Sequence, residues 1–538
     1  MVQRFQSGQF QFAERQYPDG ASRSDQQHAT VKNHPDGREG FVLMTRRQAI
    51  TGLAAALGAS PFAYSKQEQN GRPKNVLIIM SDQHKPDCLG VTGNTAVRTP
   101  NLDAFARTAV RFTSAYCTNP VCTPSRASIL TGLYTHHHQA WNNTTPWPIG
   151  HKTIAHYFGH AGYVTGLIGK MHFVDAQTHG FDYHLDFNDW YQFLGPKTKL
   201  YADELSRANS GAGLPQIDDL WRDFGDPWKG ARELDGREGP VAVGAVSKIP
   251  EEDHFESFVA RESIRFLSKY GRQQQPFLLI CSFLKPHDPF MPAERFARMF
   301  RPEAMTLPPT WGKVNLSSVP AEVRNSIEHN APTPELSDPV EARKRIAYYY
   351  ANLAQMDDRA GAVLRSLPQL GLEENTIVIY TSDHGEMLGE HGLWQKFQFY
   401  ESSCGIPLLV RAPGVSKPGV CPVPLSQVGL LPAIAELANV RVSSPIDGLS
   451  FAAQVRDPDV PTDAPVFAEY NLRTKNAKYM IRSGDYKYTF WTHDMPELYD
   501  LRADPQEMNN LALRREYQGK VAELKAKLFA WYTPPRAI

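Results

Sequence analysis

Four apolar runs in this chain are each followed by ionisable residues, and this repetition constrains the fold more than any other feature. The runs cover residues 75–80, 164–168, 276–283 and 376–381. Each is continuously apolar, which is typical of strands that are buried on both faces of a sheet. Segments with helical spacing lie between them, at 100–110, 125–133, 153–161, 254–270 and 346–367. This alternation predicts an α/β fold in which helices sandwich a mostly parallel central sheet.

The residues that follow these runs are candidates for one shared site. In open parallel sheets, ligands bind at the carboxyl ends of the strands. Since the four runs end at the same edge of such a sheet, we expect their polar side chains to converge there. The candidates from these four ends are Asp82, Gln83, Lys170, His172, His287, Asp383 and His384.

A cysteine and an arginine stand four residues apart, at Cys122 and Arg126. Helical spacing places the sulfur and the guanidinium on one face, one turn apart. The arginine would hold an anion there and favour the reactive form of the sulfur. A bare pair of this kind is usually a buried cysteine near a surface arginine. Here the segment reads C-T-P-S-R followed by A-S-I-L-T-G, which makes the pattern more specific.

Two adjacent pairs have side chains that could bind a metal ion, Asp82-Gln83 and Asp383-His384. Oxygen ligands suit a hard cation, and the addition of one histidine leaves Ca²⁺, Mg²⁺ and Mn²⁺ open. An Asp-His pair alone is equally compatible with a helix cap and a core histidine. The presence of both pairs around the cysteine segment favours the metal interpretation. Three consecutive histidines at 136–138 also suggest a metal site, but substrate contact or packing is the favoured interpretation there.

Composition bounds the remaining possibilities. With 538 residues the chain is too long for one ordinary core, so two domains are expected. Its 57 basic and 57 acidic residues cancel, which excludes a strongly basic nucleic-acid binder but leaves room for a local anion site. Six cysteines without C-x-x-C spacing indicate neither a zinc site nor a disulfide scaffold.

The N-terminal region predicts export. Residues 1–43 are polar and aperiodic, so we expect disorder or an upstream extension, with Met44 as the alternative start. Residues 44–65 carry twin arginines before a short apolar run and resemble a twin-arginine signal, which predicts a periplasmic location. An inconsequential amphipathic leader is the alternative. The run is too short for a stable membrane anchor, and we expect none elsewhere.

Two further changes of pattern mark the organisation of the chain. Residues 182–249 are rich in Gly, Asp and aromatic residues and predict an insertion over the active-site face. After residue 440 the pattern changes to short strands at 465–470, 479–483 and 486–491, followed by a helix at 517–532. We therefore expect a catalytic domain over 74–440 and a smaller C-terminal α+β domain over 441–538.

Taken together, the motifs resemble type I, formylglycine-dependent sulfatases of the alkaline phosphatase superfamily. That family carries D-[DQ], C-x-P-S-R, G-K-x-H, P-H-x-P-[FY] and D-H-G-x-x-x-G-x-H, and this chain shows all five in that order within residues 74–435. The local similarity is to choline-sulfatase-like or arylsulfatase-like members. Gln83 stands where many members have aspartate, and His384 where many have asparagine, which leaves the choice between Ca²⁺ and Mn²⁺ open.

The resemblance implies an alkaline-phosphatase-like fold and hydrolysis of a sulfuric ester. A formylglycine-generating enzyme would convert Cys122 to formylglycine (3-oxoalanine), whose hydrated diol takes the sulfuryl group. One divalent metal, Ca²⁺ first and Mn²⁺ or Mg²⁺ otherwise, would be held by Asp82, Gln83, Cys122, Asp383 and His384.

The resemblance also implies roles for the remaining residues. Arg126 and Lys170 would stabilise the diol and the ester oxygens. His172 would assist deprotonation of the second hydroxyl of the diol. His287 and Lys396 would bind sulfate on the leaving-group side, and one of them would supply the proton.

Two other functions remain as alternatives. A phosphate or phosphonate ester hydrolase on the same scaffold is the nearest, because a tetrahedral anion site with Asp-His ligands serves both chemistries. A non-catalytic binding protein is less favoured, since every matched position holds a competent residue. The expected partners are a small-molecule or saccharide sulfate ester and the formylglycine-generating enzyme, but no nucleic acid. The oligomeric state is left open.

Overall fold

The computed structural model describes residues 74–147, 150–174, 177–201, 243–329 and 334–534. The expected extension at 1–43, the expected signal at 44–65 and residues 202–242 of the expected insertion lie outside these ranges. None of the helices in these ranges combines the length and the apolar character that a membrane span requires.

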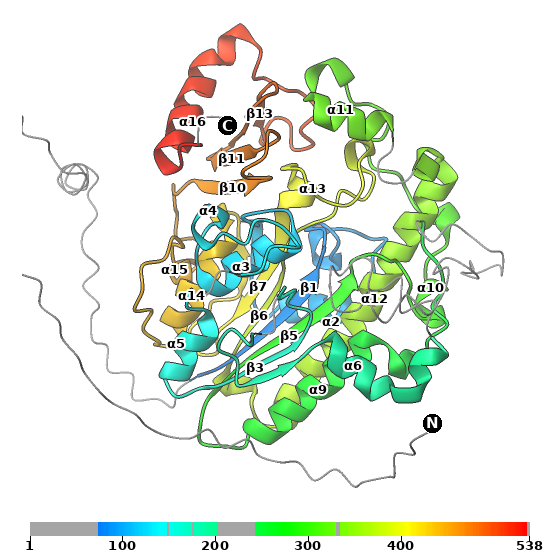
Figure 1. Cartoon of the computed structure of the whole chain (residues 1–538), viewed down its shortest axis with the longest axis vertical. Coiled ribbons are helices and arrows are strands. Elements are labelled where there is room, and N and C mark those ends of the chain that lie inside the picture. The colour runs from blue at the N-terminus through cyan, green and yellow to red at the C-terminus, as the bar shows by residue number, and fades with distance from the viewer. Residues whose placement is uncertain (1–73, 148–149, 175–176, 202–242, 330–333, 535–538) are drawn as a thin grey trace, which may run out of the picture. The chain divides into compact units, whose positions relative to one another are not determined.

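A nine-stranded sheet forms the core of the described chain (Figure 1). Its order is β4 (Tyr183–Leu185), β3 (Val164–Gly169), β5 (Phe277–Pro286), β1 (Asn75–Asp82), β6 (Thr376–Ser382), β7 (Gly405–Arg411), β2 (Val110–Tyr116) and β8 (Gly419–Cys421), with β9 (Leu425–Ser426) also beside β2. Only β7 runs antiparallel to its neighbours in this sheet of described strands. The prediction of a mostly parallel sheet is therefore confirmed.

The central strands end in register. Ile78 of β1 pairs with Ile280 of β5 and with Ile379 of β6. At the carboxyl end, Asp82 lies opposite Pro286, and the residue before Asp82 lies opposite the last residue of β6. The segments that follow β1, β5 and β6 therefore leave the sheet at one edge, as the strand-end argument predicts.

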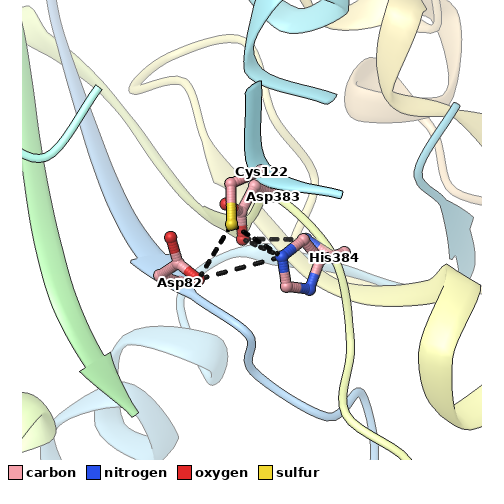
Figure 2. Close-up of side chains that lie close together, drawn as sticks. All are labelled: Asp82, Cys122, Asp383 and His384. Carbon is pink, nitrogen blue, oxygen red and sulfur yellow. Dashed lines mark hydrogen bonds and ion pairs between the residues drawn. The ribbon is translucent and has the colours of Figure 1, made fainter. Parts of the chain in front are cut away.

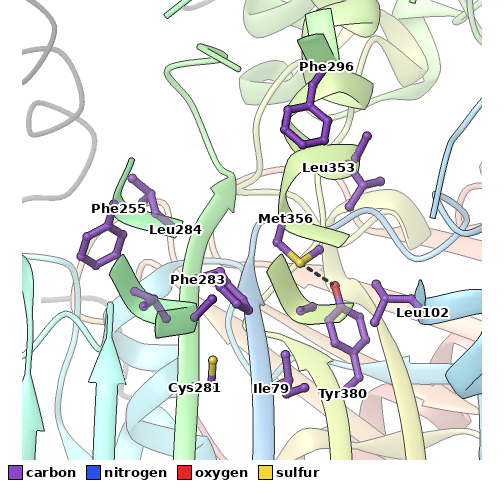
Figure 3. Packing of buried hydrophobic residues seen from close by; sticks show 14 of the residues in the cluster. Ile79, Leu102, Phe255, Cys281, Phe283, Leu284, Phe296, Leu353, Met356 and Tyr380 are labelled. Atoms are coloured by element: carbon purple, nitrogen blue, oxygen red, sulfur yellow. Dashed lines mark hydrogen bonds between the residues drawn. The ribbon is translucent and has the colours of Figure 1, made fainter. Parts of the chain in front are cut away.

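Both faces of the sheet are covered by helices, which explains why its strands are apolar without alternation. Leu77 and Ile79 of β1 face one core, whereas Ile78 and Met80 face the other. Figure 3 shows part of the first core, in which Ile79 and Tyr380 lie beneath Met356. Its helices are α2 (Pro100–Ala106), α6 (Phe187–Leu194), α9 (Phe255–Tyr270), α10 (Glu294–Ala297) and α12 (Pro339–Gln369). The second core is covered by α3 (Cys122–Thr131), α5 (Ile154–His160), α14 (Leu430–Leu437) and α15 (Ala452–Arg456).

Some expected boundaries need correction. The helix expected at 100–110 ends at Ala106, and Val110 begins strand β2. β-branched residues such as Val110 favour strands, and the helical spacing alone placed the end of the helix too late in the chain. The helix expected at 346–367 begins earlier, at Pro339, because the side chain of Asp338 accepts the N–H of Val340 and caps the helix there.

The C-terminal part forms a second, antiparallel sheet covered by one helix. Its order is β10 (Val466–Tyr470), β11 (Lys478–Ser483), β12 (Tyr486–Trp491) and β13 (Glu497–Asp500). Helix α16 (Gln518–Trp531) buries Leu524 and Leu528 against Ile481 and Tyr488 of this sheet. The smaller α+β unit predicted from the sequence is thus present, with β13 as an additional strand. Three further helices are α4 (Thr135–His138), α11 (Ala321–Glu328) and α13 (Glu401–Cys404).

Candidate active site

Cys122 is the first residue of helix α3, and all ten residues of this helix are buried. The side chain of the N-cap residue Val121 makes no capping hydrogen bond. Instead, Oδ1 of Asn143 accepts the N–H of Thr123 at 3.0 Å and satisfies one of the free donors of the first turn. The sulfur of Cys122 thus lies at the positive end of a helix, where negative charge is favoured.

Side chains that follow β1, β3 and β6 surround the sulfur of Cys122, and Figure 2 shows those at the ends of β1 and β6. Sγ lies 3.3 Å from Nε2 of His384 and 3.8 Å from Oδ1 of Asp82. It also lies 3.4 Å from Nζ of Lys396 and 3.8 Å from Nζ of Lys170. The structure therefore brings the cysteine and the predicted strand-end residues into one buried cluster.

The side chains around Cys122 control the ionisation of its thiol. Burial raises the pKa of the Cys122 thiol, but Lys170, Lys396 and His384 outweigh burial and lower that pKa well below its ordinary value. Burial also raises the pKa of Asp82, yet Lys170 and Arg126 help to hold that carboxyl ionised. The site is therefore built to stabilise negative charge at residue 122.

Arg126 bridges the carboxylates of Asp82 and Asp383. Its Nη2 lies 2.8 Å from Oδ2 of Asp82, and its Nε lies 2.8 Å from Oδ2 of Asp383. Its Nη1 donates to the carbonyl of Lys170 and to Oγ of Ser282. The guanidinium is fully buried, and its contacts link the ends of β1, β3 and β6 to the middle of β5.

The remaining donor atoms fit a divalent metal. Ligand atoms of Asp82, Cys122, Asp383 and His384 all lie within 4.8 Å of one another. Since Arg126 occupies one oxygen of each aspartate, Oδ1 of each is the atom near Nε2 of His384, at 3.8 and 3.7 Å. Nδ1 of His384 donates to the carbonyl of Gly385, which leaves the lone pair of Nε2 for a metal. Two carboxylates and one imidazole form a suitable donor set for a hard or borderline cation.

His172 is placed differently from the other candidates. Its backbone has a φ of 61°, and its carbonyl accepts the hydroxyl of Thr123. Both ring nitrogens are buried, and the imidazole interacts with the thiol of Cys122. Burial lowers the pKa of His172, while the nearby Cys122 acts in the opposite direction. A neutral imidazole next to residue 122 is suited to accept a proton from it.

On the other side, Lys396 and His287 contact each other. Nζ of Lys396 lies 2.9 Å from Nε2 of His287 and 2.7 Å from Oε1 of Gln83. Nδ1 of His287 donates to the carbonyl of Asp288 at 2.6 Å. Lys396, which no strand end carries, thus reaches the sulfur from the loop after β6.

Sequence reasoning missed three residues around the cluster. Asn143 caps the cysteine helix, whereas Asp288 and Glu386 both accept hydrogen bonds from the amide of Gln83. Asp288 and Glu386 lie inside the matched P-H-D-P and D-H-G-E segments, so their positions gave a signal. Asn143 lies in an irregular loop and gave none.

The three histidines of α4 do not converge on a metal. His138 contacts Oγ of Ser128, and Nδ1 of His136 lies 2.9 Å from Oε2 of Glu469 in the C-terminal sheet. His137 pairs instead with Asp447. Substrate contact or packing is the favoured interpretation for these histidines, and their contacts within the protein agree with packing.

Two family models match this chain. The family model described as Sulfatase matches residues 74–440, and the model described as N-sulphoglucosamine sulphohydrolase, C-terminal, matches residues 389–533. The chain belongs to the sulfatase family. It is a sulfatase of the alkaline phosphatase superfamily, and the function predicted from the motifs is confirmed at this level.

Named relatives of this sulfatase have similar lengths. It is 30% identical over 450 residues to the choline-sulfatase of Rhizobium meliloti (strain 1021), covering 82% of this chain and 83% of the relative. It is 28% identical over 462 residues to an arylsulfatase of Clostridium perfringens (strain 13 / Type A), covering 84% and 92%.

Solved structures share the fold of this sulfatase. A phosphonate monoester hydrolase of Agrobacterium radiobacter matches with a TM-score of 0.70 at 24% identity, covering 85% of this chain and 95% of that one. A structure in complex with its substrate D-glucosamine-2-N,6-O-disulfate matches with a TM-score of 0.65 at 22% identity, covering 85% and 97%.

Proposed function

We propose that this sulfatase hydrolyses a sulfate monoester through a formylglycine formed from Cys122. The surroundings of residue 122 carry the proposal, since two lysines and His384 lie within 3.8 Å of its sulfur. Such a site stabilises an anion at this position and at a bound sulfate. When Cys122 is converted by a formylglycine-generating enzyme, the aldehyde is hydrated to a diol. One hydroxyl oxygen of this diol is the nucleophile that attacks sulfur and displaces the alcohol.

A divalent metal belongs to the proposed site. Asp82, Asp383 and His384 would hold it beside residue 122. Bound there, it supplies Lewis acidity toward the nucleophile and the ester oxygens. Ca²⁺ is the first expectation and Mn²⁺ or Mg²⁺ the alternatives, because the oxygen-rich donor set includes one imidazole.

The chain's own residues divide the remaining work. Arg126 keeps the two carboxylates oriented, and Lys170 faces the same side of residue 122 as Asp82. His172 accepts the proton of the second hydroxyl as sulfate leaves and the aldehyde re-forms, because its buried ring lies next to residue 122. Lys396 and His287 bind sulfate on the leaving-group side. We assign the leaving-group proton to Lys396.

The proposed substrate is a sulfate ester of a small molecule or a saccharide. The relatives include a choline-sulfatase and an N-acetylglucosamine-6-O-sulfatase of Bacteroides thetaiotaomicron, which supports this class without choosing within it. We also propose export to the periplasm through the twin arginines at positions 46 and 47. Cell fractionation of the wild-type chain and of a variant with both arginines changed to lysine tests the export proposal. Equal distribution of the two proteins would contradict it.

Two measurements test the proposed chemistry. The purified protein should hydrolyse 4-nitrophenyl sulfate faster than the matched 4-nitrophenyl methylphosphonate. Faster turnover of the phosphonate would favour the alternative hydrolase, which shares the fold of the structural relatives. The tryptic peptide covering residues 112–126 contains Cys117 and Cys122. In active protein it should take up one alkyl group at Cys117 and carry an aldehyde at position 122. An alkylated Cys122 would contradict the formylglycine mechanism.

A further inference from the structure

The amide of Gln83 is oriented by charges on both of its sides. Its Nε2 donates to Oδ1 of Asp288 at 3.3 Å and to Oε2 of Glu386, while its Oε1 accepts from Nζ of Lys396 at 2.7 Å. The opposite orientation would place the amide N–H groups against the ammonium and the carbonyl oxygen against two carboxylates. Gln83 therefore has one favoured orientation, in which its oxygen accepts from Lys396.

Glu386 holds the other end of this arrangement. Its carboxylate is fully buried, and its Oε1 accepts the N–H groups of Leu388 at 2.9 Å and of Gln395 at 2.7 Å. These two bonds close the loop that presents Lys396. Leu388, Gln395 and Phe397 all have positive φ angles, of 46°, 65° and 81°. Non-glycine residues adopt this region only when their surroundings impose it, and Glu386 supplies part of that restraint.

We propose that Glu386 and Gln83 are positioning residues for Lys396, and that Gln83 does not ligate the metal in this chain. The proposal rests on the proposed function of Lys396 and departs from the ligand set expected from the family motif. Glu386 acts twice, through the backbone that carries Lys396 and through the amide that binds its ammonium. The metal is then left to Asp82, Asp383, His384 and residue 122.

The chain offers a matched pair of substitutions. In Glu386→Gln the new amide can keep its oxygen toward the two backbone N–H groups, but its NH₂ then faces Nε2 of Gln83. The two donors repel, so Gln83 turns and Lys396 loses its acceptor. Gln83→Ala removes the same acceptor directly. Glu390→Gln is the control, because Glu390 lies in the same loop and pairs with Lys85 outside the cluster.

The test compares kinetics and metal content in these three variants and the double variant Gln83→Ala/Glu386→Gln. We expect Glu386→Gln and Gln83→Ala each to lower kcat by about 10–100-fold, as loss of a supporting hydrogen bond does around metal and catalytic groups. The double variant should lose no more than the poorer single variant, because both act through Lys396. The loss should be larger for an alkyl sulfate than for 4-nitrophenyl sulfate, which a purely structural defect would not produce.

Metal content separates this proposal from the ligand role. By plasma mass spectrometry, Gln83→Ala should hold as much metal per chain as the wild type, whereas Asp383→Ala should lose it. Loss of metal in Gln83→Ala, or multiplicative kinetic losses in the double variant, would overturn the proposal. The metal measurement does not depend on the substrate, so failure of the sulfatase chemistry would be recognised separately. A lower melting temperature with unchanged kcat per folded chain would also count against it.

Discussion

Nζ of Lys396 donates to Nε2 of His287 across 2.9 Å, while Nδ1 of the same ring donates to the carbonyl of Asp288. A carbonyl only accepts, so the proton of the neutral ring lies on Nδ1. Nε2 therefore presents a lone pair to the ammonium. In this arrangement the proton available for the leaving group lies on Lys396. His287 accepts a hydrogen bond from the lysine and holds it in position.

Lys396→Ala should therefore show a strong dependence on the leaving group. Hydrolysis of an alkyl sulfate should fall by about 100-fold or more, in the range for general acids. Hydrolysis of 4-nitrophenyl sulfate should fall much less, because nitrophenolate leaves without a proton. Steady-state kinetics on both substrates measure the difference. If His287→Ala shows the leaving-group dependence and Lys396→Ala does not, the assignment of the acid is wrong.

Arg126→Lys should destabilise the fold as well as the site. A single ammonium cannot reach both Asp82 and Asp383, so one buried carboxylate loses its partner. We expect the free energy of unfolding to fall by about 3 kcal/mol. Urea unfolding measures the change, and Arg456→Lys, at an exposed pair with Glu436, is the control that should stay within about 0.5 kcal/mol of wild type. Equal effects of the two substitutions would contradict this account.

Removal of the metal should lower the melting temperature. Without a cation, the Oδ1 atoms of Asp82 and Asp383 face each other's charge in a buried cluster. A cation present at 100 times its dissociation constant stabilises the folded chain by about 2.7 kcal/mol. Calorimetry in a chelator, and again after Ca²⁺ or Mn²⁺ is restored, tests this expectation. An unchanged melting temperature in protein shown to have lost its metal would be inconsistent with the proposed ligands.

Buried histidines predict an acid-labile fold. Burial lowers the pKa values of four of them to about 3 or 4, at His84, His138, His254 and His391. Each folded-state pKa lies below the value of about 6.5 expected in the unfolded chain. The unfolded chain therefore takes up protons first, and stability that is complete above pH 6.5 is lost as the pH falls toward 4.

One substitution isolates this effect. His254→Gln keeps a donor for the carbonyl of Ile249, the present partner of Nε2, but cannot be protonated. The difference between its melting temperatures at pH 7 and pH 5 should be smaller than that of the wild type. An equal acid loss in His254→Gln would show that other groups control it.

Much of the site was predictable because local patterns determine it. The apolar runs before Asp82 and Asp383 predicted strands, and parallel strands necessarily meet at one edge. The antiparallel direction of β7 was not predictable in this way, since it depends on pairing with β6 and β2 rather than on its own residues. The commitment of Gln83 to Lys396 depends on contacts between segments 313 residues apart. No local pattern carries that information, and the metal-ligand role that the motif implies for Gln83 stays a prediction.

The distance along the chain between Cys122 and its contacts determines when the cysteine becomes buried during synthesis. The partners that enclose Cys122 lie 262 and 274 residues later, at His384 and Lys396. At the usual rate of protein synthesis, that length of chain takes about 13 to 55 seconds to emerge from the ribosome. Throughout that interval, residues 122–126 lack the later residues that bury them in the folded chain. The proposed formylglycine-generating enzyme would therefore act on this segment during an interval set by the length of chain still to be made.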